Sequence, residues 1–184
     1  GIIVGHKICE SVVNIDRRMT YTAVNAILEA KNGTEEPQTD APEKEKSKEK
    51  AEFAKKSLEE YAHFVPMFLL LDETARVLRK KRMARGAVDF DFPECKIILD
   101  AKGRPVEIRP YERNAATMLI EDCMLAANET VAEDYYWQQI PFLYRSHEKP
   151  DGEKIKRFGI LINNFGYSLR LQNGELHPKE MQKL

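Results

Sequence analysis

The spacing of the hydrophobic residues changes along the chain, and that change constrains the fold more than any other feature of the sequence. Over residues 51–85 and again over 112–134, apolar side chains recur every three or four positions, which predicts long stretches of amphipathic helix. Between them, residues 96–100 and 106–109 flank a short polar turn, which predicts a β-hairpin with Gly103 at a position of positive φ. We therefore expect an α+β fold in which mixed or antiparallel strands pack with several helices.

Shorter elements complete the expected pattern. Thr20 is expected to cap a short helix that Asn32-Gly33 ends, and Gly86 to end a later helix. Pro66 is expected to break, kink or restart the helix around it, and proline is tolerated best in a first helical turn. The remaining patterns predict strands at residues 1–13, 88–92 and 143–145, a helix at 151–164, and a last helix from His177-Pro178. Because regular structure is expected at both ends, we expect the chain to be part of a longer protein.

Residues 32–50 differ in composition from the rest of the chain. They contain six acidic and four basic residues and two prolines, and Ala41 is their only apolar side chain. Such a segment cannot bury enough surface to offset the entropy lost on ordering. We expect a charged, mobile insertion whose last part runs into the helix that begins near Ala51.

The overall composition excludes several classes of protein. The 29 Lys and Arg residues nearly balance 30 Asp and Glu residues, which excludes a basic nucleic-acid tail and an acidic solvating protein. The longest apolar stretch, Val65–Leu71, is far shorter than the about 20 residues that span a bilayer. Cys9, Cys95 and Cys123 lie too far apart in sequence for a zinc motif or a disulfide framework. We expect reduced cysteines, no membrane and a cytoplasmic location.

Two groups of charged residues are candidates for chemistry. A basic cluster ends the helix before Gly86, where cations suit the helix dipole and where a phosphate-contacting patch is the alternative interpretation. Its members are Arg76, Arg79, Lys80, Lys81, Arg82 and Arg85. Asp89 and Asp91 offer the oxygen ligands that hard cations prefer, but no third carboxylate lies nearby in the sequence. We therefore expect no metal site at this pair.

A third group is polar and follows the helix predicted over 112–134. Asn114, Glu121 and Asn128 are spaced by sevens, so they share one narrow stripe of a helix. Polar groups at the edge of an apolar face either bond neighbouring backbone or line a groove. In a groove, the Glu121 carboxylate could accept a hydrogen bond from a ribose 2′-hydroxyl, the group that distinguishes RNA from DNA.

Four stretches of sequence, taken together and in order, match one known family, although any one of them alone would be weak evidence. They are RRMTYTAVNAIL (17–28), LRKKRMARGAVDFDFPECKIILDAKGRPVEI (78–108), YERNAATMLIEDCMLAANETVA (111–132) and IPFLYRSHEKPD (140–151), with FGYSLRLQNGELHPKEMQ (165–182) as their continuation. Together they resemble the catalytic (RNB) domain of the ribonuclease II/R family of processive 3′→5′ exoribonucleases, and its ribonuclease R branch in particular. The resemblance covers nearly the whole chain apart from residues 32–50.

The resemblance implies an activity and three binding residues. The family hydrolyses single-stranded RNA from the 3′ end to nucleoside 5′-monophosphates with Mg²⁺. Tyr21 matches a family tyrosine that helps to tell RNA from DNA, and Glu121 matches the glutamate that works with it at the ribose. Phe90 matches an aromatic residue that stacks against a nucleotide near the 3′ end. All three are expected to bind single-stranded RNA and none is expected to be catalytic.

Two family motifs have no match in this sequence. One is the aspartate cluster that binds the metal, and the other is the arginine motif that contacts the scissile phosphate; we expect the first before Gly1 and the second after Leu184. Residues 1–184 are thus expected to form the middle to later part of one catalytic domain, with RNA-channel residues, no metal ligands and no activity alone. The alternative is a non-catalytic α+β interaction or scaffold module in which residues 32–50 serve as a docking element.

Overall fold

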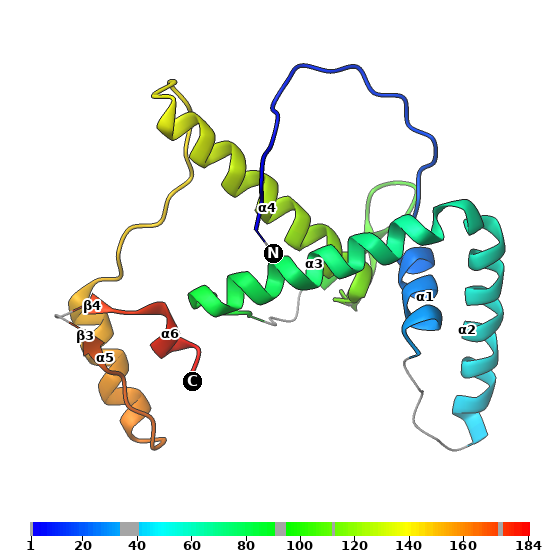
Figure 1. Ribbon diagram of the computed structural model, residues 1–184. Helices are drawn as coiled ribbons and strands as arrows, with labels where there is room; N and C mark the ends of the chain where they lie inside the picture. The colour runs from blue at the N-terminus through cyan, green and yellow to red at the C-terminus, as the bar shows by residue number, and fades with distance from the viewer. Residues whose placement is uncertain (1, 34–40, 91–94, 112, 173–174) are drawn as a thin grey trace. The chain divides into compact units, whose positions relative to one another are not determined.

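The structure, a computed structural model, describes residues 2–33, 41–90, 95–111, 113–172 and 175–184 (Figure 1). Its helices are α1 (Tyr21–Asn32), α2 (Ala41–Glu60), the 3₁₀ turn η1 (Ala62–Phe64), α3 (Val65–Arg85), α4 (Ala115–Trp137), α5 (Gly152–Asn163) and α6 (Pro178–Met181). Its strands are β1 (Cys95–Leu99), β2 (Pro105–Pro110), β3 (Leu171–Gln172) and β4 (Glu175–Leu176). The α+β prediction is confirmed, and both strand pairs within the described residues are antiparallel.

The chain divides into two compact units. Unit 1 comprises Gly1–Leu78 and Glu94–Val131, and unit 2 comprises Arg79–Pro93 and Ala132–Leu184. Helix α3 therefore contributes to both units. The prediction that residues 1–184 belong to a single domain stays a prediction.

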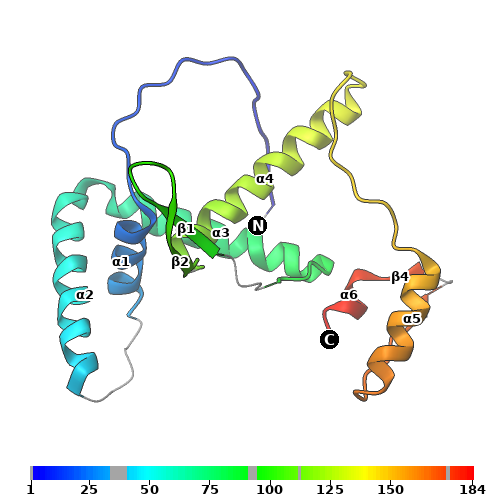
Figure 2. The ribbon, with the colours of Figure 1, turned by 180° about the vertical axis from the view of Figure 1, so that it is seen from behind.

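Unit 1 contains the main hydrophobic core. Helix α1 begins where the Thr20 side chain accepts a hydrogen bond from the Ala23 amide, and it ends at Gly33, whose φ is 66°. Between these caps, Ile27 and Leu28 are fully buried. Residues from α2 to α4 complete the core around them, namely Tyr61, Phe68, Ala75 and Leu119. Helices α1 and α2 pack side by side, as both ribbon views show (Figures 1 and 2).

Helix α2 begins earlier than the sequence pattern indicated. It starts at Ala41 rather than near Ala51, so residues 41–50 of the expected insertion are helical. Glu and Lys, which dominate this stretch, have high helix propensity and can lengthen a helix without any apolar face. Residues 34–40 lie outside the described part of the chain, and the mobility of the insertion stays a prediction.

Proline and glycine occupy the positions expected from their backbone preferences. Pro66 is the second residue of α3, where its missing N–H breaks no helical hydrogen bond. Gly86 follows the end of α3 with a φ of 106°, and Gly103 lies in the hairpin turn with a φ of 77°. Both glycines therefore have the positive φ that L side chains rarely adopt.

The predicted hairpin is present and is formed by the antiparallel strands β1 and β2 (Figure 2). Ile97 pairs with Ile108, and the irregularity between Ile98 and Leu99 lies next to the turn. Asp100 organises the turn, because its Oδ1 accepts hydrogen bonds from the amides of Lys102 (2.8 Å) and Arg104 (2.9 Å). This arrangement is the Asx-type turn that explains why Asp precedes the glycine.

These contacts predict a pH dependence of the turn. The Arg104 amide, followed by the Lys102 amide and the Arg104 guanidinium, holds the pKa of Asp100 below its ordinary value of 3.8. Its contribution to stability is therefore complete above pH 3.8 and is lost as the pH falls through the lower, folded pKa. We expect the Lys102 and Arg104 amide NMR signals to shift with a midpoint below pH 3.8. Asp100→Asn should keep the turn and abolish the shift, whereas a midpoint at or above 3.8 would contradict the prediction.

Unit 2 joins the end of α3 to α6. The Gln182 side-chain amide donates to the carbonyl oxygens of Met83 (2.9 Å) and Ala87 (2.5 Å). Asp151 caps α5 by accepting from the amides of Glu153 and Lys154. His177 caps α6 in the same way, by accepting from the amide of Lys179. Both helices therefore begin where the sequence predicted, at residues 151 and 177–178.

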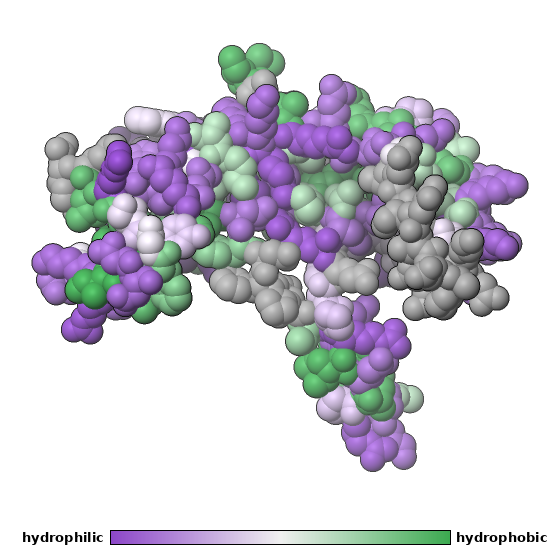
Figure 3. All heavy atoms as spheres, turned by 90° about the horizontal axis from the view of Figure 1, so that it is seen from below, coloured by the Kyte–Doolittle hydropathy of each residue, from purple (hydrophilic) through white to green (hydrophobic). Residues whose placement is uncertain are grey.

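Two predicted strands are not present. Residues 2–13 and 143–145 have no regular secondary structure, and Val4 and Val12 are fully exposed. A strand needs a hydrogen-bonded neighbour, and no described residue pairs with either segment. The strand expected at 88–92 is absent over 88–90, and the rest lies outside the described residues. On the face of the molecule shown in Figure 3, exposed hydrophobic side chains lie in separate groups between hydrophilic ones.

Candidate functional site

Tyr21 and the first turn of α4 belong to the same unit and are linked through Asn25. Tyr21 is the first residue of α1 and its side chain is about half exposed. Asn25 lies one turn further along the same helical face. Its Oδ1 accepts a hydrogen bond from the amide of Ala115, the first residue of α4, at 3.1 Å. This contact fixes the start of α4 against the helix that carries Tyr21.

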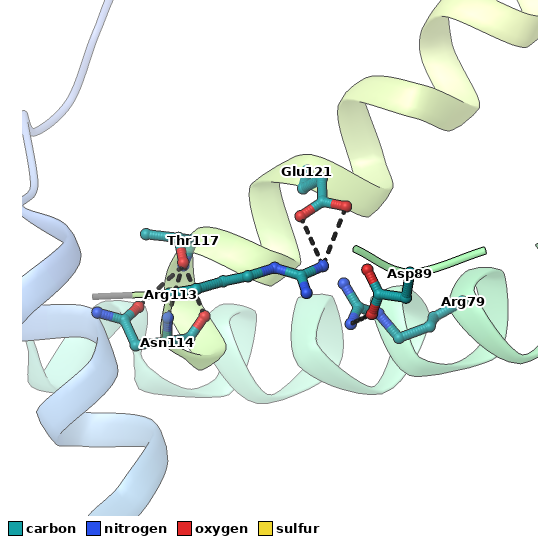
Figure 4. Close-up of polar contacts among 6 residues, drawn as sticks. All are labelled: Arg79, Asp89, Arg113, Asn114, Thr117 and Glu121. Carbon is teal, nitrogen blue, oxygen red and sulfur yellow. Dashed lines mark hydrogen bonds and ion pairs between the residues drawn. The ribbon is translucent and has the colours of Figure 1, made fainter. Parts of the chain in front are cut away.

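The first turn of α4 is closed by a reciprocal pair of hydrogen bonds (Figure 4). The Thr117 amide donates to Asn114 Oδ1 at 3.0 Å, and the Asn114 amide donates to Thr117 Oγ1 at 2.9 Å. Such a capping box satisfies amides that have no partner inside the helix. Of the two interpretations of the polar stripe, backbone bonding therefore holds for Asn114. Asn128, further along the stripe, is exposed.

Glu121, two turns into α4, is held by a neighbouring cation. Arg113 Nη2 lies 3.1 Å from Glu121 Oε2 and 3.3 Å from Oε1, as the dashed lines in Figure 4 show. The two side chains are 24 % and 33 % exposed, so the pair is partly shielded from water. In this contact the partner of Glu121 is a side chain rather than the local backbone.

Phe90 lies in unit 2 and follows the turn that ends α3. Its side chain is largely exposed. The preceding residue, Asp89, forms an ion pair with Arg79 of α3 at 3.4 Å (Figure 4). This contact ties the segment that carries Phe90 to the last turns of the helix. Tyr21 and Glu121 thus share one unit, and Phe90 belongs to the other.

The basic cluster is divided between structural and exposed members. Arg76 pairs with the buried Asp72 at 2.7 Å, and Arg79 pairs with Asp89. These two contacts agree with a structural role. Lys80 and Lys81 are exposed on the helix surface and leave the phosphate interpretation open for that part of the cluster.

The described residues do not fit a divalent metal. No three His, Cys, Asp or Glu side chains among them lie close enough together to hold an ion. Asp89 contacts an arginine, and Asp91 lies outside the described residues. A Mg²⁺ ion prefers octahedral oxygen coordination with carboxylates, so we derive no step through a metal bound to these residues.

Sequence reasoning missed two residues of this site. Asn25 follows Tyr21 by one helical turn, and that spacing was the signal that could have found it. Arg113 directly precedes the cap of α4 and reaches Glu121 along the helix. No periodic pattern marks such a contact, because Arg113 lies outside the helix and its side-chain direction is set by the fold.

Among the described residues, none of the helices combines the length and the apolar composition that crossing a membrane requires. All three cysteines are free, with Cys9 and Cys95 exposed. Burial, followed by the nearby Asp122 carboxylate, raises the pKa of the Cys123 thiol. A raised pKa lowers the thiolate fraction, and Cys123 packs against the hydrophobic core of unit 1.

The fold is shared with solved ribonuclease R structures. Mycoplasma genitalium RNase R in complex with ribose methylated single-stranded RNA matches 89 % of this chain with a TM-score of 0.60 and 21 % identity. The same enzyme in complex with double-stranded RNA matches 85 % with a TM-score of 0.57 and 19 % identity. This chain covers 22 % and 24 % of the two structures, respectively.

Sequence comparison assigns the family. The RNB domain model matches residues 1–183, and the chain belongs to this family. Ribonuclease R 1 of Lactococcus lactis is 32 % identical over 99 % of this chain, and ribonuclease R of Thermotoga maritima is 34 % identical over 100 %. The chain spans only about a fifth of the length of these relatives, 20 % and 22 %.

Proposed function

We propose that the chain is an RNA-contacting segment of a processive 3′→5′ exoribonuclease that degrades single-stranded RNA to nucleoside 5′-monophosphates. The observation that carries this proposal is the RNB match over residues 1–183, with relatives named ribonuclease R. The solved neighbours that are complexes with single- and double-stranded RNA support RNA as the ligand.

Within this function, Tyr21 and Glu121 are proposed to contact the ribose. A carboxylate accepts hydrogen bonds, and the ribose 2′-hydroxyl donates one that deoxyribose lacks. The hydrogen bond from Ala115 to Asn25 supports joint action, because it ties the helix of Tyr21 to the helix of Glu121. The partial shielding of Glu121 strengthens any hydrogen bond that it accepts.

Phe90 is proposed to stack against a base near the 3′ end. Base–aromatic stacking tolerates any sequence because every base has a π-face, which suits an enzyme that degrades RNA processively. The largely exposed ring of Phe90 supports this role, since a ring packed in a core could not receive a base.

We propose that the complete enzyme uses Mg²⁺ and that its ligands lie outside this chain, because the aspartate cluster of the family has no match in the sequence. In metal-assisted hydrolysis the ion activates water and stabilises the charged transition state. We also propose a cytoplasmic location, which the three free cysteines support.

The test is digestion of 5′-labelled single-stranded RNA with Mg²⁺ or with EDTA. The full-length protein should shorten the RNA progressively and release nucleoside 5′-monophosphates only with Mg²⁺, and should leave DNA of the same sequence intact. This chain alone should leave the RNA intact. Digestion by this chain would place the metal ligands inside it, whereas no digestion by the full-length protein would favour the scaffold alternative.

A further inference from the structure

We propose that Arg113 is a positioning residue that fixes the Glu121 carboxylate in the orientation in which it recognises the ribose. This inference rests on the proposed ribose role of Glu121. It starts from one contact: a single guanidinium nitrogen, Nη2, reaches both carboxylate oxygens, at 3.1 and 3.3 Å.

The environment of the pair separates it from the Arg109–Glu107 pair, which belongs to the same unit. Arg113 and Glu121 are 24 % and 33 % exposed, whereas Arg109 and Glu107 are 62 % and 46 % exposed at 2.6 Å. An exposed pair is screened by water and holds its side chains weakly. A partly buried, charge-assisted pair restricts both partners more strongly.

The backbone of Arg113 lies at a fixed point of the fold. The next residue, Asn114, is held by the reciprocal hydrogen bonds with Thr117, and Ala115 is held by Asn25. Arg113 therefore extends from an anchored segment toward Glu121, which lies on the helix that the same segment starts. Because the backbone next to Arg113 is held, fewer side-chain conformations bring its guanidinium to Glu121 than a mobile segment would allow.

This arrangement favours recognition by lowering the entropy lost on binding. A glutamate side chain loses substantial rotamer freedom when it is immobilised, and a residue already ordered in the unbound protein loses less. A carboxylate can accept about four hydrogen bonds, so contact with Arg113 is compatible with a hydroxyl donor. Arg113 would therefore raise the preference for RNA without touching the RNA.

A purely structural role for Arg113 makes a different prediction. If the ion pair only stabilises the start of α4, its loss should lower stability and weaken RNA and DNA binding equally. If the pair positions Glu121, its loss should lower the RNA-to-DNA affinity ratio. The ratio thus separates the two roles.

The experiment measures the dissociation constants for single-stranded RNA and for DNA of the same sequence, with the full-length protein in EDTA to prevent cleavage. Glu121→Gln keeps an acceptor oxygen but loses the charge, and a charge-assisted hydrogen bond is about twice as strong as a neutral one, so this variant should reduce the ratio about tenfold. Arg113→Gln should reduce the ratio about three- to tenfold, and the double variant should match Glu121→Gln alone, because the effects are not additive within one pair.

Two further variants control for folding. Arg109→Gln breaks the exposed pair with Glu107 and should leave the ratio unchanged. Arg113→Lys keeps the charge but replaces the rigid guanidinium with an ammonium on a flexible stem, so it should give an intermediate ratio even if Arg113→Gln unfolds.

Each contrary result has a distinct meaning. If Glu121→Gln lowers the ratio and neither Arg113 variant does, the positioning role is wrong and the ribose role stands. If the double variant lowers the ratio well beyond Glu121→Gln, Arg113 contacts RNA itself, and positioning is again wrong. If Glu121→Gln leaves the ratio unchanged, the proposed ribose role fails and the inference about Arg113 fails with it.

Discussion

Gly86→Ala is expected to release α6 from the end of α3 and to destabilise unit 2 by about 2–5 kcal/mol. A positive φ alone costs an L residue about 1–2 kcal/mol, and overpacking adds about 1–3 kcal/mol. A Cβ on Gly86 would lie 2.9 Å from the Lys179 amide nitrogen and 3.0 Å from Pro178 Cβ, at a φ of 106°. The Lys179 nitrogen belongs to the backbone, so no side-chain rotation relieves the clash.

The same displacement would break the contacts of Gln182 with the end of α3. Its side-chain amide donates to Met83 and Ala87 carbonyl oxygens, at 2.9 and 2.5 Å, and both bonds require α6 to lie close to Gly86. Hydrogen exchange at residues 179–182 measures this release directly, because local opening exposes the amides. We expect faster exchange there, together with a lower melting temperature.

Gly103→Ala is the matched control. Gly103 has a φ of 77° but nothing within 4 Å of its added Cβ, so this variant carries only the backbone cost. It should lower stability by about 1–2 kcal/mol and should leave exchange at residues 179–182 unchanged. If Gly86→Ala had no greater effect than Gly103→Ala, the close packing of α6 on this glycine would be wrong.

The features that the sequence predicted well depend on local chemistry. Thr20 caps α1, Pro66 opens α3, and Gly86 and Gly103 have positive φ, as expected. In each case the residue's own backbone preference or its nearest amides decide the conformation. Neighbours distant in sequence are not needed, so the pattern alone is sufficient.

The features that the sequence predicted poorly depend on partners far away along the chain, or were predicted from composition alone. Alternation over residues 1–13 predicted a strand, but a strand exists only where another strand pairs with it, and none of the described residues does so. Helix α2 begins at Ala41 because the high helix propensity of its Glu and Lys residues is sufficient where no apolar face is present. Low hydrophobicity was thus a poor guide to the start of this helix.

In the candidate site, too, local spacing predicted some features and the folded chain decided others. The seven-residue spacing placed Glu121 at the edge of an apolar face, and the structure finds it half-buried there. Spacing did not assign roles to Tyr21 or Phe90; the family resemblance did. Contact of Glu121 with Arg113 joins residues eight positions apart through one long side chain, and only the folded chain defines that geometry.

Phe90→Ala is expected to weaken binding of single-stranded RNA by the full-length protein about 5- to 150-fold. Alanine substitution of a stacking aromatic costs about 1–3 kcal/mol per base. The loss should be similar for RNA and DNA, because stacking uses the face of the base rather than the sugar. It should also be similar for all four 3′-terminal bases. Affinities measured in EDTA with oligonucleotides that differ only in their last nucleotides test these expectations.

Phe165→Ala and Phe90→Tyr separate stacking from general effects of losing an aromatic ring in unit 2. Phe165 is 72 % exposed, against 61 % for Phe90, but it lies outside the sequence motif on which the proposed stacking role of Phe90 rests. Phe165→Ala should therefore leave RNA affinity unchanged, and Phe90→Tyr should retain most of it because the ring face is kept. Equal losses for both alanine variants would mean that Phe90 acts through the fold of unit 2. A loss restricted to RNA would instead mean that Phe90 senses the sugar, a role that the ribose proposal gives to Tyr21 and Glu121.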